Sequence, residues 1–290
     1  MKAFISEARK KYHLKLLENG VLTIDAKGIP SNADSASGTS IAIAQGIFSR
    51  LMPNRMVTKT HKKSDGQTAG AKFEQINMEF LLETFPKLQN LRPGDWQIKK
   101  FGNKNAIKTS NFSQYEHLEY LNRLTAADAK LAASMGNDYI VTPDVVIYRN
   151  PVSDEEINTP VFMVDDSVSL MAAIRKSKGG LPILHASISA KWTMRSDRAQ
   201  NSRTEALGLI RNRKGHLPHI VVVTGEPMPG RLASLALGTG DIDCMYHFAL
   251  YELVEAVKET KAEDSIEMLN VLIKGKRIKD ISDLPLDLSV

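Results

Sequence analysis

The second half of the chain alternates between segments that favour strands and segments that favour helices. β-Branched and aromatic residues are concentrated in residues 139–148, 181–192 and 219–224, and the last run is apolar enough for a buried strand. Helices are expected at about 196–212 and from about Cys244 to Glu259. Strands that are separated by helices predict an α/β fold, in which a central mixed β-sheet is flanked by α-helices.

The first half of the chain is expected to be mainly helical. Residues 2–18, 39–52 and about 70–86 have the pattern of helices, and the first two end at an Asn-Gly pair and before a proline. The sequence shows no internal repeat, low-complexity tract or long linker. We therefore expect residues 1–290 to form a single domain, with its α/β core at about 130–260.

Composition argues against two broad classes of protein. The longest apolar runs are far shorter than the roughly 20 residues that a membrane span requires, so neither anchoring nor export is indicated. The single cysteine, Cys244, cannot form an internal disulfide, as expected of a cytoplasmic protein held together by packing. The net charge of +5 is compatible with a polyanionic partner. Between Arg195 and Lys214, six basic residues accompany two acidic ones.

Two acidic residues and a lysine form a pattern typical of phosphodiester hydrolysis. This reaction needs charge stabilisation at the phosphate and an activated water, and carboxylate-bound Mg²⁺ supplies both. Asp144 lies at the bend of one expected strand, and Lys191 lies near the end of the next, with 46 residues between them. Ser189 shares a strand face with Lys191 and holds a place that is usually acidic in enzymes of this design. Glu205, on the following helix, is positioned to replace that carboxylate, although an acidic residue such as Asp144 can also be merely solvated at a strand edge.

The start of the expected helix at 196–212 carries side chains suited to reading G·C base pairs. Arg195, Asp197 and Arg198 lie where side chains can enter a major groove. Arginine donates to guanine O6 and N7, and aspartate accepts from cytosine N4. Arg198 and Glu205 are seven residues apart, close to two turns, so base reading and metal binding would share one helix face. The alternative is that Asp197 caps the helix and the arginines are simply solvated.

The sequence around these residues resembles the CCGG-family type II restriction endonucleases of the PD-(D/E)XK superfamily. The resemblance runs through nearly the whole chain and includes SNAD (31–34), GQTAGAKFE (66–74), RPGDW (92–96), TPDVVIYRN (142–150) and the run from HASISAKW to VVVTGEP (185–227). It implies the restriction endonuclease-like fold, with Asp144 and Glu205 as ligands of Mg²⁺. It also implies that Lys191 positions the attacking water and the scissile phosphate, that Ser189 occupies the vacated acidic position, and that Glu74 is a supporting carboxylate.

The same resemblance implies a target and an assembly. Arg195, Asp197 and Arg198 would read the inner pairs of CCGG in double-stranded DNA, and Gln67 and Arg231 match positions that read the outer pair. GCCGGC is therefore the expected target, cut to give 5′-phosphate ends. The chain departs from the family pattern between residues 35 and 65, where a few extra residues border the outer-pair reader. Proteins of this family form homotetramers of two back-to-back dimers, and a palindromic target independently requires twofold symmetry.

Two other functions are compatible with part of the pattern. Ser189 in a usually acidic place is what a DNA-binding protein that has lost catalysis would show, although Glu205 argues against such a loss. A structure-selective repair or recombination nuclease on the same fold would cut branched DNA irrespective of sequence, and it would have no use for a base-reading turn. Mg²⁺-dependent cleavage of a plasmid at discrete sites distinguishes the sequence-specific endonuclease from both.

Overall fold

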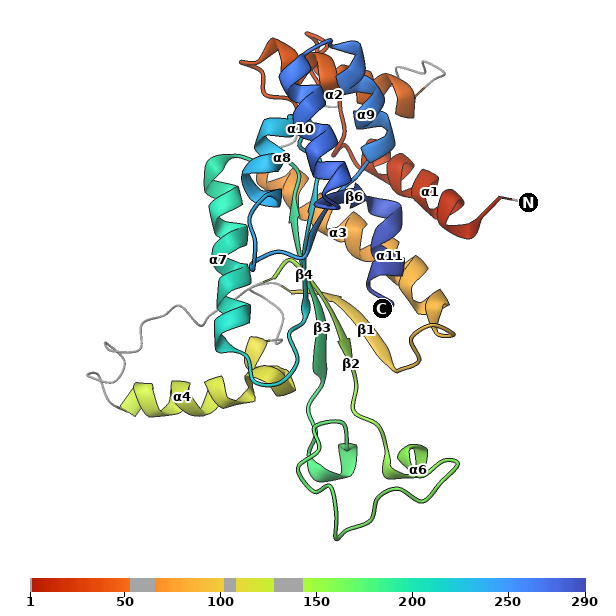
Figure 1. The fold of residues 1–290 in the computed structure, drawn as a ribbon, viewed down its shortest axis with the longest axis vertical. Helices are drawn as coiled ribbons and strands as arrows, with labels where there is room; N and C mark the ends of the chain where they lie inside the picture. Colours follow the sequence, from red (N-terminus) through yellow and green to blue (C-terminus); the bar gives the residue numbers. More distant parts are fainter. Residues whose placement is uncertain (1, 53–65, 102–107, 128–142) are drawn as a thin grey trace.

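A six-stranded sheet lies at the centre of the part of the chain that the computed structural model describes, which is residues 2–52, 66–101, 108–127 and 143–290 (Figure 1). The strands follow one another across the sheet in chain order: β1 (Trp96–Lys100), β2 (Val145–Arg149), β3 (Ile183–Lys191), β4 (His219–Thr224), β5 (Cys244–His247) and β6 (Ile278–Asp280). The pairs β1–β2 and β2–β3 are antiparallel, whereas the pairs from β3–β4 to β5–β6 are parallel. The predicted α/β architecture with a central mixed sheet and flanking helices is confirmed.

Helices connect the parallel strands, as parallel neighbours require. α7 (Ser196–Asn212) joins β3 to β4, and α8 (Pro229–Ala236) joins β4 to β5. α9 (Leu250–Glu259) and α10 (Glu263–Lys274) join β5 to β6. β3 and β4 are buried almost throughout; β4 reads as an apolar run, whereas β3 also buries His185, Ser187 and Ser189. The predicted strands at 181–192 and 219–224 and the predicted helix at 196–212 are thus confirmed.

The helices of the first half cover the sheet and the C-terminal helices. α1 (Phe4–Glu18) packs on α3 (Gly66–Thr84), and α3 in turn packs on β1 and β3. α2 (Gly38–Leu51) packs on α9, where a Cβ at Gly46 would lie only 2.7 Å from the Cβ of Ala256. The remaining elements are α4 (Glu116–Ala127), α6 (Asp154–Ile157), α11 (Leu284–Asp287) and the short 3-10 turns η1 (Phe85–Leu88), η2 (Thr109–Asn111), η3 (Ser113–Tyr115), η4 (Lys176–Lys178) and η5 (Ile281–Asp283). The three helices predicted in the first half are confirmed.

Contacts between distant parts of the sequence close this arrangement. Buried apolar residues from Ala8 to Leu288 belong to one hydrophobic cluster. The guanidinium of Arg9 on α1 donates to Asp280 at 2.8 Å and to Glu252 at 2.6 Å, and so joins α1 to β6 and α9. Among the described helices, none combines the length and apolar character that crossing a membrane requires.

The predicted helix from Cys244 to Glu259 is wrong in its first part. Cys244–His247 forms β5, which pairs in parallel with β4, and the helix α9 begins only at Leu250. All four residues of β5 are buried, and the edge of β4 offers them backbone hydrogen bonds. This pairing outweighs local helix propensity. Residues 139–142 of the first predicted strand lie outside the described residues, as do the extra residues from 53 to 65.

Candidate active site and base-reading cleft

Asp144 and Lys191 meet where β2 begins and β3 ends. Val145 lies opposite Ile188 in the antiparallel pair, which places the preceding Asp144 beside the last residues of β3. The Oδ2 atom of Asp144 accepts hydrogen bonds from Lys191 Nζ at 2.9 Å and from the backbone N–H of Ala190 at 2.7 Å. Two of the predicted catalytic residues are therefore in direct contact, as the order of the strands requires.

Glu205 projects from α7 toward the same strand end. The pKa of Glu205 is raised to about 7, mainly by burial. The charge of Asp144 also raises this pKa, whereas the charge of Lys191 and a hydrogen bond with Ser189 lower it. The hydroxyl of Ser189 lies 3.1 Å from that of Ser202 on α7, and both serines are buried. The side of α7 that carries Ser202, Ala206 and Leu209 is buried. The structure thus brings Asp144, Lys191, Ser189 and Glu205 together.

The chemistry of these donors fits a Mg²⁺ ion. Mg²⁺ takes one or two protein carboxylates and keeps several waters. The site offers two carboxylates, on Asp144 and Glu205, and in the described residues no group of three or more His, Cys, Asp or Glu side chains is arranged to hold a metal. The negative charge of Asp144 contributes to the raised pKa of Glu205, so a cation between them would relieve their repulsion. Softer metals that prefer histidine or cysteine would find a poorer set of ligands here.

Glu74 is part of the same cleft but is held from the other side. It lies on α3, and its carboxylate forms an ion pair with Lys100 of β1 at 2.7 Å. Glu74 and Lys191 both line a cleft of about 780 Å³. This position is compatible with a supporting carboxylate whose orientation is set by Lys100.

The first turn of α7 presents the predicted base-reading residues beside this site. Arg195 is the N-cap residue, is exposed and makes no side-chain capping hydrogen bond. Asp197 is the second residue of α7, two positions after the N-cap, and is exposed, so the alternative in which Asp197 caps the helix is wrong. The Arg198 guanidinium donates to the carbonyl oxygen of Thr193 at 3.2 Å and also to its hydroxyl, which folds the side chain back over the turn. Arg195 and Arg198 line the cleft together with Lys191.

Arg231 on α8 also lines the cleft and is paired with two carboxylates. Its Nη1 lies 3.8 Å from Oε2 of Glu226, and its Nη2 donates to Asp34. A hydrogen bond from the backbone of Ala36 and the pairing with Arg231 lower the pKa of Asp34. The sequence alone did not reveal the contact of Asp34 with Arg231, because the two residues are 197 positions apart and such a contact leaves no local pattern. Gln67 lies in the first turn of α3, and its side chain lies outside the described residues.

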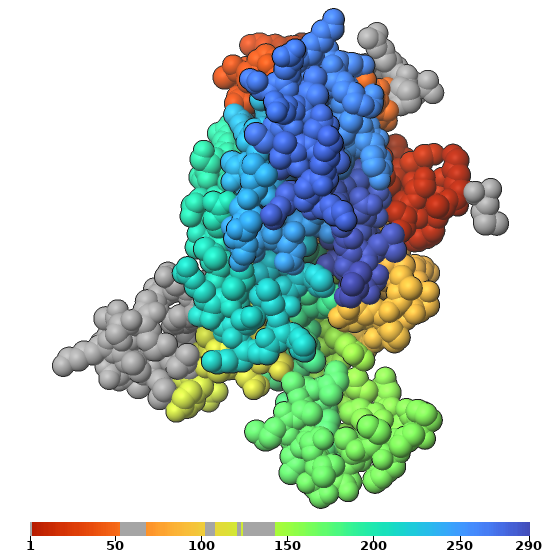
Figure 2. Space-filling model, in the orientation of Figure 1, coloured from red at the N-terminus to blue at the C-terminus, as the bar shows by residue number. Residues whose placement is uncertain are grey.

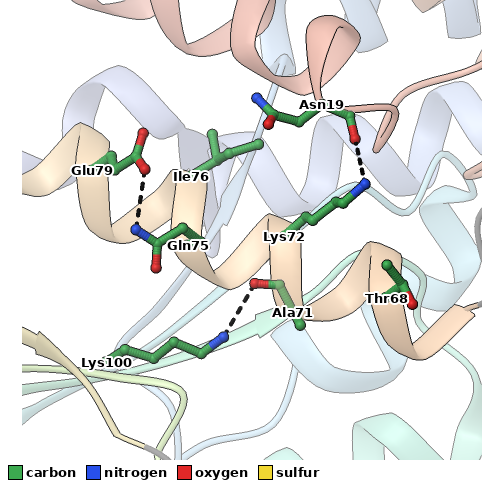
Figure 3. A pocket seen from close by; sticks show the side chains of 8 residues that line it. All are labelled: Asn19, Thr68, Ala71, Lys72, Gln75, Ile76, Glu79 and Lys100. Carbon is green, nitrogen blue, oxygen red and sulfur yellow. Dashed lines mark hydrogen bonds between the residues drawn. The ribbon is translucent and has the colours of Figure 1, made fainter.

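A second hollow, of about 490 Å³, lies on the opposite face of α3 (Figure 3). Both lysines that line it are engaged within the protein: Lys72 donates to the carbonyl oxygen of Asn19 at 3.0 Å, and Lys100 donates to that of Ala71 at 3.2 Å. Gln75 donates to Glu79 at 3.1 Å. None of its lining residues is a predicted site residue, so the cleft beside β3 is the candidate site.

Comparisons with known proteins point to one enzyme family. The family model described as "NgoMIV restriction enzyme" matches residues 12–290. The chain is 47% identical, over 100% of both sequences, to the "Type II restriction enzyme NgoMIV" of Neisseria gonorrhoeae. Among solved structures, the Bse634I restriction endonuclease is 14% identical with a TM-score of 0.38, over 76% of this chain and 82% of that one. A PspGI restriction endonuclease complex with substrate DNA is 14% identical with a TM-score of 0.36, over 98% of this chain and 91% of that one.

Proposed function

The chain belongs to the NgoMIV restriction enzyme family and is a type II restriction endonuclease, and we propose that it hydrolyses double-stranded DNA at a palindrome with a CCGG core. The proposed cofactor is Mg²⁺, the proposed products carry 5′-phosphate ends, and GCCGGC is the proposed full target. The observation that carries this proposal is the meeting of Asp144, Lys191 and Glu205 at one strand end, beside a helix turn that carries two arginines and an aspartate.

In this proposal each residue of the strand end has a distinct task. Asp144 and Glu205 would hold Mg²⁺, which would supply positive charge at the scissile phosphate and activate water. Lys191 already donates to Asp144, and its ammonium group orients the attacking water and the phosphate. Ser189 provides a hydroxyl to Glu205 where a carboxylate would add a third negative charge. Glu74, which pairs with Lys100, is a supporting carboxylate on the α3 side of the cleft.

Base reading is proposed for the residues of the same cleft that lie beside this strand end. Arg195, Asp197 and Arg198 would contact the inner C·G pairs, and Arg231 and Gln67 would contact the outer pair. Arg198 and Glu205 are seven residues apart on α7, so the position of the bases relative to the metal is set by a single helix. A protein that only binds DNA does not need Glu205 beside Asp144, because it does not hydrolyse the phosphate. A structure-selective nuclease does not need Arg195 and Arg198, because it does not read bases.

Replacing Arg198 with alanine tests the reading of the inner pairs. Loss of one bidentate contact to guanine is expected to reduce discrimination against a site with one altered inner pair by about 1 to 3 kcal/mol, or roughly 5- to 150-fold. The measurement is kcat/KM on duplexes with the cognate and the altered site. Arg211→Ala, at the other end of α7, is the control and should leave the ratio unchanged. Equal losses on both duplexes would show that Arg198 contacts only phosphate.

We also propose that the chain acts as a homotetramer of two dimers, each of which holds one DNA site. Residues 150–182 leave the sheet between β2 and β3 at the end of these strands opposite to Asp144 and Lys191. They project from the lower end of the body in Figure 2 and expose six large apolar side chains: Val161, Phe162, Met163, Val168, Leu170 and Met171. Arg175, which is only 1% exposed, orders the segment by pairing with Asp154 at 2.8 Å. Association through this segment would keep the clefts on the outside, and exposed apolar patches of this kind mark association surfaces.

A charged double substitution in the projecting segment should separate the dimers. Phe162→Asp with Met171→Asp places negative charge on two exposed apolar positions, and we expect the molar mass from light scattering to halve. Leu14→Asp with Leu82→Asp, at exposed apolar positions on α1 and α3, is the matched control. An unchanged mass in the first variant would exclude this segment as the interface.

A further inference from the structure

Glu226 is a buried carboxylate to which the proposed cleavage reaction gives no task. It lies two residues after β4, in the loop that leads into α8, and its side chain is 0% exposed. A carboxylate in such a position needs hydrogen bonds or an ion pair, because burial without them costs several kcal/mol. Burial raises the pKa of Glu226, and two backbone hydrogen bonds and the charge of Arg231 lower it. The groups that stabilise its charge therefore indicate what it is for.

The carboxylate of Glu226 contacts both proposed base-reading elements. Its Oε2 atom accepts a hydrogen bond from the backbone N–H of Met194 at 2.9 Å, and Met194 directly precedes Arg195. Its Oε1 atom accepts from the backbone N–H of Met228 at 3.1 Å, and Met228 is the N-cap residue of α8. The same Oε2 atom lies 3.8 Å from Nη1 of Arg231. One side chain thus connects the start of the α7 turn with Arg231.

The loop that carries Glu226 is itself fixed on both sides. The Asn32 side chain, which is buried, donates to the carbonyl oxygen of Gly225 at 2.8 Å. A Cβ at Gly225 would lie only 2.5 Å from the Trp192 ring, so any residue other than glycine would clash there. Glycine therefore allows the loop to pack closely against the residue that follows β3. Asp34, two residues after Asn32, pairs with Arg231. Three segments that line the cleft therefore meet around Glu226.

We propose that Glu226 is a positioning residue for sequence specificity, which holds the Met194–Arg198 turn and Arg231 in one fixed relation. The inference rests on the proposed reading of DNA in this cleft. Glu226 does not touch DNA in this scheme. It acts through the Met194 backbone and through Arg231, so that the inner and the outer base pairs are read by a single rigid unit.

The test is the discrimination of the Glu226→Gln variant. Glutamine keeps the shape but loses the charge, and its NH₂ group cannot accept a hydrogen bond from a backbone N–H. We expect the ratio of kcat/KM between the cognate duplex and a singly altered duplex to fall at least tenfold for both inner-pair and outer-pair changes. On the cognate duplex we expect a larger change in KM than in kcat. Asp241→Asn is the matched control: Asp241 is buried and pairs with Arg203 at 2.7 Å outside the cleft, so its loss should lower stability and leave both ratios unchanged.

A double-substitution cycle with Arg231→Ala separates the two contacts of Glu226. In the Arg231→Ala background, Glu226→Gln should no longer affect outer-pair discrimination, and it should still affect inner-pair discrimination through Met194. If the wild type is sequence-specific and a folded Glu226→Gln variant leaves both ratios unchanged, the inference about Glu226 is overturned and the proposed function stands. A wild type that cuts without sequence preference would overturn the proposed function as well. If Glu226→Gln does not fold, Glu226→Asp, which keeps the charge and shortens its reach, should show a smaller loss of both ratios, and unchanged ratios would again overturn the inference.

Discussion

Replacing Lys191 with methionine is expected to lower the rate of DNA cleavage by about 100- to 1,000-fold or more, while binding to the cognate duplex changes little. The magnitude is that of removing one preorganised charge at the position where the transition state develops charge. Lys191 is only 17% exposed at the end of β3, and it donates to Asp144 at 2.9 Å. Methionine keeps the length and apolar stem of the side chain, so the packing around Ala190 and Trp192 should survive. The loss should therefore appear in the chemical step.

The measurement for Lys191→Met is single-turnover cleavage with saturating enzyme and Mg²⁺, with binding to the same duplex followed separately by fluorescence anisotropy. Lys214→Met is the control, because it removes a charge from the same basic segment at an exposed position after α7. A rate within tenfold of the wild type would remove Lys191 from the catalytic machinery. A parallel loss of binding would instead indicate that Lys191 serves to hold DNA.

Replacing Glu205 with glutamine should have a second large effect, and it should move catalysis and stability in opposite directions. Loss of one of two carboxylates is expected to lower the cleavage rate about 100-fold or more at a fixed Mg²⁺ concentration. Burial raises the pKa of Glu205 to about 7, above its value in the unfolded chain, so its ionisation lowers the free energy of unfolding of the metal-free protein as the pH rises from about 4.5 to 7. Glutamine carries no such charge. The metal-free variant should therefore melt at a higher temperature than the wild type at pH 8.

Thermal melting with and without Mg²⁺ measures both effects of Glu205→Gln. A ligand that binds only the folded state raises the free energy of unfolding by RT ln(1 + c/Kd) at a free ligand concentration c, so the melting temperature rises with ligand concentration. The wild type should gain stability from Mg²⁺, and the variant should gain much less. Glu259→Gln, at an exposed position at the end of α9, is the control for the loss of one acidic side chain. Equal gains from Mg²⁺ in the variant and the wild type would exclude Glu205 as a ligand.

Much of this site could be predicted because its residues are fixed by strand geometry. Asp144 and Lys191 lie at ends of strands that are neighbours in the sheet, and strand alternation alone places Ser189 and Lys191 on one face. Glu205 could be placed because α7 follows β3 directly and helical periodicity sets its direction. The family was also predicted correctly, since its motifs occur in segments that are each recognisable on their own.

The contacts that could not be predicted join segments far apart in the chain. Asp34 reaches Arg231 across 197 residues, and Glu226 reaches Met194 across 32, and neither pair has a spacing that a helix or a strand would repeat. β5 was missed for a related reason. Cys244–His247 precedes a helix and has no strand-like alternation, and only pairing with β4 in the folded protein makes it a strand. Local pattern therefore predicted the meeting of Asp144, Lys191 and Glu205 better than the long-range contacts around them.

Mapping the ends of digested DNA tests the proposed activity most directly. The purified protein would be incubated with a plasmid that contains GCCGGC and other CCGG-core palindromes, with Mg²⁺ or with EDTA, and all fragment ends would be sequenced and their phosphates assigned. We expect every break to lie within a CCGG-core palindrome, to carry a 5′-phosphate and to be absent in EDTA. Breaks scattered over unrelated sequences, or cleavage that persists in EDTA, would contradict a Mg²⁺ site at Asp144 and Glu205 coupled to a reader of G·C pairs.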